Sequence, residues 1–165
     1  MTPETAKSLA QFVLPQIEQE FATSRRVLAA VPNDQGSYKP SEKCMTALEL
    51  AIHIAAAEVF FLSGVVKGGF DWKQPDLKTP ADVLAYYEET VPPLLKEVAE
   101  ASGETLSKNI AFAKWNHEAV NYLSLHLRHT IHHRGQLSAY LRPMGAKVPS
   151  IYGPSADDPG QTASA

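Results

Sequence analysis

The sequence predicts an all-α domain built as a four-helix bundle with long connecting segments. Four segments carry apolar residues at helical spacing, none alternates like a half-buried strand, and 165 residues suit one domain with a hydrophobic core. Hydrophobic residues at 44% and charged residues at 20% are ordinary values for a soluble globular protein. We expect the bundle to occupy residues 1–156 and the small, polar residues 157–165 to form a disordered tail.

The first predicted helix covers about residues 3–31, and a loop over residues 32–36 ends it. Thr2 and Pro3 have the residue types of an N-cap and a first helical position. Pro15 lies inside the helical pattern and lacks an amide donor, so we expect the helix to kink or restart there.

The second predicted helix covers about residues 46–67 and is the most apolar part of the chain. Thr46 and Glu49 have the spacing of a capping box, and a Gly-Gly pair ends the helix. Because the segment also contains His53 and Glu58, the sequence favours a core helix over a membrane span.

The third predicted helix begins at Thr79 and runs toward Ser102, and the fourth covers about residues 116–141. The Pro92-Pro93 pair removes two amide donors, so we expect it to break or kink the third helix. Two connections are long enough to permit crossovers between helices, at residues 68–78 and 103–115.

Five of the six histidines fall in the fourth segment, at positions 117, 126, 129, 132 and 133. His129 and His133 are four residues apart, so their rings project side by side and could reach one metal ion. His126 shares their side of the helix, whereas His117 and His132 point elsewhere and are expected in solvent. His53 lies on the inward side of the second helix and is the natural third ligand.

Other interpretations of these residues stay open. A histidine on an apolar face is usually a core residue bonded to a carbonyl or carboxylate. His126, Tyr122 and Tyr140 are candidates for orienting a substrate or moving a proton, yet each is also typical of a packing residue with a polar tip. Glu49 either supports His53 by a hydrogen bond or serves only as a helix cap, and the capping role is favoured.

Three passages carry a resemblance to a known family. Residues 129–137 read HTIHHRGQL and contain the string H-x-x-x-H-R-G-Q, residues 48–58 carry a histidine in an apolar helix, and residues 141–153 follow the last helix. Together they resemble the DinB-like family of four-helix-bundle proteins over nearly the whole chain.

The resemblance implies one divalent metal ion, zinc or nickel, held by His53, His129 and His133, and it implies a homodimer. It also implies a possible low-molecular-weight thiol, since relatives include transferases and isomerases that use mycothiol or bacillithiol. Many members carry a further histidine where this chain has Leu125, and this difference is expected to alter the wall of the pocket.

Three imidazole ligands leave a coordination position open, which is typical of catalytic metal sites. We therefore expect a metal-dependent enzyme that acts on a small-molecule substrate. The expected reaction is either transfer or isomerisation of a thiol conjugate, or hydrolysis. The alternatives are a non-catalytic, stress-related metal-binding protein and a dimer whose histidines only satisfy one another. A net charge of −3 argues against nucleic acid as a partner. The chain has a single cysteine, and its N-terminal residues do not have the pattern of a signal peptide. Both observations favour a cytoplasmic protein, and we expect no association with a membrane.

Overall fold

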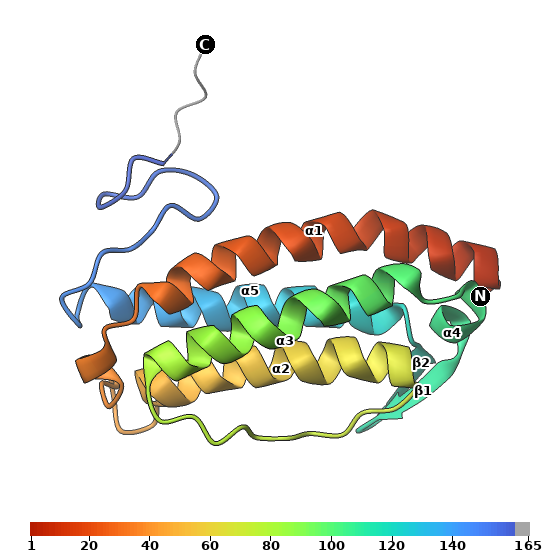
Figure 1. The fold of residues 1–165 in the computed structure, drawn as a ribbon, viewed down its shortest axis with the longest axis horizontal. Helices are drawn as coiled ribbons and strands as arrows, with labels where there is room; N and C mark the ends of the chain where they lie inside the picture. The colour runs from red at the N-terminus through yellow and green to blue at the C-terminus, as the bar shows by residue number, and fades with distance from the viewer. Residues whose placement is uncertain (161–165) are drawn as a thin grey trace, which may run out of the picture.

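Four long helices pack side by side in the computed structural model, which describes residues 1–160, and a short helix and a β-hairpin lie at one end (Figure 1). Helix α1 packs against both α3 and α5, and so does helix α2. The predicted four-helix bundle is therefore confirmed. The elements are α1 (Pro3–Ala29), the 3-10 turn η1 (Asn33–Gln35), α2 (Ala47–Lys67), α3 (Pro80–Glu100), α4 (Gly103–Ser107), β1 (Asn109–Phe112), β2 (Trp115–Glu118) and α5 (Asn121–Leu141).

The helix directions show that one connection is a crossover. In Figure 1, α1 and α5 run one way and α2 and α3 run the other, and the segment between α2 and α3 returns along the length of the bundle. This segment lays Phe70 over α2, where Gly64 makes room for it. A Cβ atom on Gly64 would stand 2.1 Å from the Phe70 ring, so the missing side chain is what allows the close approach.

Threonine side chains begin the three helices α1, α2 and α3. The Thr2 hydroxyl accepts from the Thr5 amide, and Thr46 exchanges hydrogen bonds with Glu49 in the predicted capping box. A second capping box joins Thr79 and Asp82. Each cap satisfies amides that the helix itself leaves unpaired and stabilises its helix by about 1 kcal/mol.

The interior prolines do not interrupt their helices. Of the break or kink that was expected at the Pro92-Pro93 pair, the break is wrong, because α3 continues through it. That pair lies inside α3 and is exposed, so water can reach the carbonyls that lose their amide donors. Pro15 lies inside α1, which continues past it without a restart and is bowed along its length in Figure 1.

The β-hairpin corrects the expected structure around residue 116, where the fourth helix was expected to begin. Residues 109–118 pair as two antiparallel strands, and α5 begins only at Asn121. The two-residue turn consists of Ala113 and Lys114, and Ala113 has a φ of 52°, a left-handed conformation that is uncommon for residues with a side chain. The turn therefore lacks the Asn-Gly or Asp-Gly pair by which a short hairpin is recognised in a sequence.

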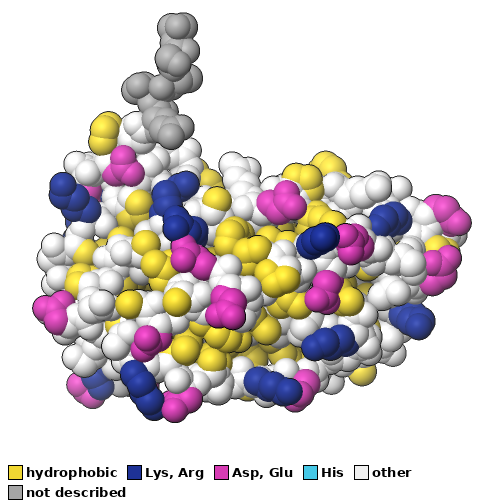
Figure 2. Space-filling model, viewed as in Figure 1, with side chains coloured by type: hydrophobic (Ala, Val, Ile, Leu, Met, Phe, Trp, Pro, Cys, Tyr) yellow, Lys and Arg dark blue, Asp and Glu magenta, His cyan; other side chains and the backbone are white. Residues whose placement is uncertain are grey.

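Helix α2 is long and apolar enough to cross a membrane, and within residues 1–160 no other helix meets that criterion. Yet 72% of its most apolar window is buried inside the bundle, which confirms the prediction that α2 is a core helix. Figure 2 shows acidic and basic side chains interspersed over the face that α1 and α3 form.

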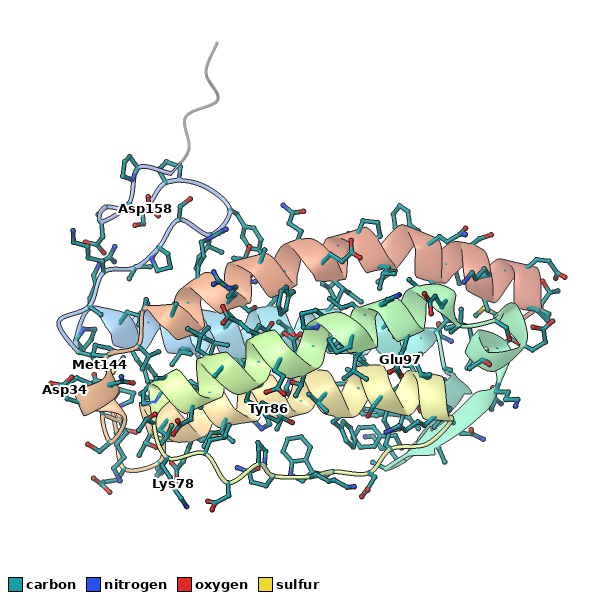
Figure 3. The ribbon with its side chains drawn as sticks, viewed as in Figure 1. Asp34, Lys78, Tyr86, Glu97, Met144 and Asp158 are labelled. Carbon is teal, nitrogen blue, oxygen red and sulfur yellow. The ribbon has the colours of Figure 1, made fainter. Side chains whose placement is uncertain are left out.

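The segment after α5 folds back beside the end of α1. The Asp157 carboxylate accepts from Arg142 and from the Val148 amide, and the Asp158 carboxylate accepts from the Ser150 amide (Figure 3). The tail that was expected to be disordered from residue 157 is therefore hydrogen-bonded at its start. Residues 161–165 lie outside the described part of the chain.

Replacing Gly103 by alanine should destabilise the fold by about 1–3 kcal/mol, the usual cost of overpacking. The new Cβ would stand 2.4 Å from the carbonyl oxygen of Pro3, and backbone must move to relieve that contact. Gly135→Ala is the matched control, because an added Cβ would meet nothing within 4 Å in residues 1–160 besides its chain neighbours and the adjacent backbone of its own helix, and it should stabilise α5 by about 1 kcal/mol. Urea unfolding at equal m-value measures both changes, and a Gly103→Ala protein as stable as wild type would contradict this packing.

Candidate metal centre

Three histidines from two helices bring their rings together between α2 and α5. The Nε2 atom of His53 lies 3.1 Å from Nε2 of His129 and 3.3 Å from Nε2 of His133. One ring nitrogen from each residue lies within 4.8 Å of the others, and all three side chains are half-buried. The arrangement unites the three residues that the sequence singled out as ligands.

The spacing of these nitrogens fits a shared metal ion better than hydrogen bonds between the rings. Two nitrogens bound tetrahedrally at ~2.0–2.1 Å stand about 3.3 Å apart, close to both distances from His53. A neutral imidazole carries a single N–H, so His53 could donate to one neighbour at most. One divalent ion would accept the lone pairs of all three rings.

Burial keeps all three imidazoles neutral. Loss of solvent lowers the pKa of His53 and His133, and it lowers the pKa of His129 to about 3, with a further contribution from the neighbouring histidines. A neutral imidazole offers the lone pair that a metal needs, whereas imidazolium has none. The site is therefore ready for a cation at neutral pH.

Gln136 orients one of the ligands. His133 Nδ1 donates to the Gln136 Oε1 atom at 2.7 Å, and this bond leaves the lone pair of His133 on Nε2, the atom that faces the other two rings. Sequence reasoning placed Gln136 beside the last ligand but assigned it no role. Its i, i+3 position relative to His133 on a helix was the available signal.

Glu49 is a helix cap rather than a partner of His53. Its carboxylate accepts from the Thr46 amide at 2.8 Å and from the Thr46 hydroxyl at 2.9 Å. These bonds lower the pKa of Glu49 and engage the group at the start of α2. The capping role that the sequence favoured is confirmed.

An aromatic cavity of about 540 Å³ opens beside the histidines. Two of its lining residues are His53 and His129, so two members of the triad form part of its wall. Its walls come from α2, from the crossover segment, from the hairpin and from α5. The apolar residues that line it are Ala57, Phe60, Phe61, Phe70, Trp72, Phe112, Trp115 and Leu125.

The rings of this cavity contact the proposed ligands directly. The centroid of the Trp72 ring lies 5.8 Å from that of the His53 ring, and the centroid of the Phe61 ring lies 5.6 Å from that of the His129 ring. Leu125, which stands where many DinB-like proteins were expected to carry a histidine, is part of the wall. The cavity is thus apolar up to the edge of the triad.

The three candidates for proton transfer or substrate orientation lie outside this cavity. His126 is buried beside Glu58, with 3.6 Å between its Nε2 atom and a carboxylate oxygen. The Tyr122 hydroxyl donates to the Ile110 carbonyl at 2.7 Å and joins α5 to the hairpin. The Tyr140 hydroxyl faces the Met45 carbonyl. His117 and His132 are exposed, as predicted.

The arginine of the H-x-x-x-H-R-G-Q string holds α5 in place. Arg134 is 2% exposed, pairs with Glu20 of α1 and donates to the Tyr152 hydroxyl at 2.6 Å. Tyr152 in turn donates to Glu20 at 3.0 Å. Because an unpaired buried charge is costly, this cluster fixes how the helix of His129 and His133 sits against its neighbours.

Comparison with known proteins identifies the family. Residues 8–163 match the model of the DinB family. The uncharacterized protein YjoA of Bacillus subtilis strain 168 is 34% identical over 140 residues, which cover 79% of this chain and 90% of YjoA. The crystal structure of YjoA, a DinB-like protein, superposes with a TM-score of 0.68 and 26% identity over 82% of this chain and 92% of that one.

Two more distant structures share the fold. A DinB-like protein from Bacillus cereus ATCC 10987 superposes with a TM-score of 0.74 at 21% identity, over 85% of this chain and 95% of that one. The mycothiol-dependent maleylpyruvate isomerase superposes with a TM-score of 0.56 at 16% identity, over 90% of this chain and 63% of that one. From its family match and its relatives, the chain belongs to the DinB family.

Proposed function

We propose that this protein is a metal-dependent enzyme that transfers or isomerises a small substrate with the help of a low-molecular-weight thiol. His53, His129 and His133 would hold one divalent ion, with zinc and nickel as the best candidates. The observation that carries the proposal is the convergence of three neutral imidazoles, two of which line an aromatic cavity.

A cation held by three side chains keeps at least one coordination position for another molecule. When bound, such an ion supplies Lewis acidity, which makes a coordinated thiol or water molecule acidic at neutral pH. The cavity beside His53 and His129 would give a small molecule access to that position.

The protein's own side chains would prepare the site for this chemistry. Burial keeps the ligands unprotonated, and Gln136 holds the proton of His133 on Nδ1, away from the cation. The surrounding aromatic rings exclude water from the substrate, which strengthens electrostatic interactions at the reacting atoms.

The choice of a thiol draws on a distant relative. The mycothiol-dependent maleylpyruvate isomerase has the same fold, and its name states that it requires a thiol. A thiol cofactor also suits the cytoplasm, where we propose that this protein works and where thiols remain reduced. Hydrolysis remains the other reaction that the same Lewis acid could support.

A second candidate function is metal binding without catalysis, in a stress-related binding protein. It is favoured by the position of His126, Tyr122 and Tyr140, none of which lines the aromatic cavity.

We also propose a homodimer, since Leu9 and Phe12 expose apolar surface on α1. A homodimer would sediment at twice the chain mass of 18.0 kDa.

The histidine triad should bind about one zinc or nickel ion per chain. Loss of a residue that only supports a metal ligand can lower metal affinity by ~100-fold. We therefore expect the His129→Ala, His133→Ala double variant, which loses two ligands, to lose at least that much. His132→Ala is the matched control, because this exposed histidine lies next to the ligands but outside the triad. Protein purified without a histidine tag is dialysed against each ion and assayed by mass spectrometry. Equal metal content in the wild type and the double variant would rule out the site.

Metal affinity should fall by less than about 15-fold between pH 7.5 and pH 6.0, because His129 does not titrate in this range and His53 and His133 titrate below ~6.5. Protons compete with the metal only below the pKa of each ligand, and burial lowers the pKa of all three ligands below 6.5. A site of three histidines with the ordinary pKa of ~6.5 would lose roughly 50-fold in metal affinity over this pH interval. Zinc titration calorimetry at the two pH values distinguishes these cases, and a 50-fold loss would show that the ligands are not buried as described.

Thiol-dependent turnover tests the enzymatic proposal. Metal-loaded protein is mixed with mycothiol, bacillithiol or glutathione and with an aryl chloride, so that a carbon–sulfur bond forms as chloride leaves. We expect turnover that a chelator abolishes and one added ion restores, and that His132→Ala retains. Full metal occupancy with no turnover for any thiol would instead support the non-catalytic function.

A further inference from the structure

A second cavity, of about 630 Å³, adjoins the aromatic one. The two have Trp115 of the hairpin and Leu125 of α5 as common lining residues, so they are neighbours on either side of these side chains. The second cavity has a different chemical character, because its lining includes the polar residues His117, Asn121, Ser124 and Arg128, together with Tyr122, one of the predicted candidates for substrate orientation. One face of the hairpin and of α5 thus passes from apolar to polar within a short distance.

Helix α5 connects the two cavities to the metal centre. Arg128 is the neighbour of His129 in the sequence, and Leu125 lies one turn before His129. A molecule long enough to extend from the aromatic cavity past Leu125 and Trp115 would enter the cavity that Arg128 lines. Its inner part would lie among aromatic rings and its outer part beside a guanidinium group.

Arg128 carries a charge that no acidic side chain within residues 1–160 neutralises. No carboxylate of residues 1–160 lies within ion-pair distance of its guanidinium, and no acidic residue lines its cavity. The other four arginines all have partners. Arg25, Arg134 and Arg142 pair with carboxylates, and Arg26 donates to the Ser150 carbonyl.

We propose that the two cavities together bind one amphipathic anion, with an aromatic body in the apolar cavity and a carboxylate beside Arg128. The inference deepens the proposed function and rests on it, because the aromatic body would be the part that faces the metal centre. An aromatic body suits the cavity, since ring edges and faces pack favourably against the Phe and Trp rings of its walls. A carboxylate suits Arg128, because guanidinium groups bind it in bidentate geometry.

Binding of three simple probes to the full chain tests this inference. The probes are 3-phenylpropanoate, its neutral amide 3-phenylpropanamide, and butanoate, which lacks the ring. Calorimetry is performed on metal-free and on zinc-loaded protein, with quenching of Trp72 and Trp115, the only tryptophans, as a second signal. We expect the phenyl carboxylate to bind about fivefold tighter than the amide in both forms, since an exposed ion pair contributes modestly, and butanoate not to bind measurably.

Two variants separate the two halves of the site. Arg128→Gln should abolish the preference for carboxylate over amide and leave the affinity for the amide unchanged. Trp115→Ala should weaken both phenyl probes by about tenfold and keep the preference. Arg25→Gln, which changes an arginine outside both cavities, should behave as wild type. Thermal unfolding checks that each variant is folded.

The failures of the two proposals can be told apart. If no metal binds but the carboxylate preference persists in metal-free protein, the proposed function fails and the anion site stands. Equal binding of carboxylate and amide by the wild type would overturn the anion site. A preference that requires zinc and survives Arg128→Gln would assign the carboxylate to the metal and would also overturn it.

Discussion

The packing of α2 against α5 is the constraint on which the metal centre depends. His53 belongs to α2, His129 and His133 belong to α5, and 3.1–3.3 Å between their nitrogens leaves little tolerance for sliding of one helix past the other. Glu58, five residues after His53, accepts from the Thr130 hydroxyl of α5 at 3.4 Å and so links the same two helices beneath the triad. Small displacements at this contact would separate the ligands before they unfolded the bundle.

Buried polar groups hold α2 and α5 to the other two helices of the bundle. Glu58 accepts from the Tyr87 hydroxyl of α3 at 2.6 Å, and Arg134 of α5 pairs with Glu20 of α1. Charges removed from water are tolerated only when such partners are in place, so a shifted helix would leave them unpaired. Loss of one partner of a buried pair typically costs about 3–5 kcal/mol. The metal centre thus stands on a polar framework inside an otherwise apolar core.

The cavity walls show how irregular segments complete the site. The crossover after α2 contributes Phe70 and Trp72, and the hairpin before α5 contributes Phe112 and Trp115. Gly64 permits Phe70 to lie against α2. Helices alone would leave the triad open on this side, and the two connections enclose the surface beside the histidines as an aromatic cavity.

Sequence alone determined the four long helices, most of their caps and the shared face of His129 and His133, because these depend on spacing and on bonds within one or two turns. It also singled out His53, although spacing along one helix could not show that a residue 76 positions away would meet the pair. Only the tertiary structure decided the hairpin, because its Ala113-Lys114 turn carries no recognisable signal. The tertiary structure also decided that His126, Tyr122 and Tyr140 do not line the aromatic cavity. The role of Gln136 and the unneutralised charge of Arg128 also came from the fold. Each depends on which segments, distant in the chain, lie within a few ångströms of one another, and local residue patterns do not encode that proximity.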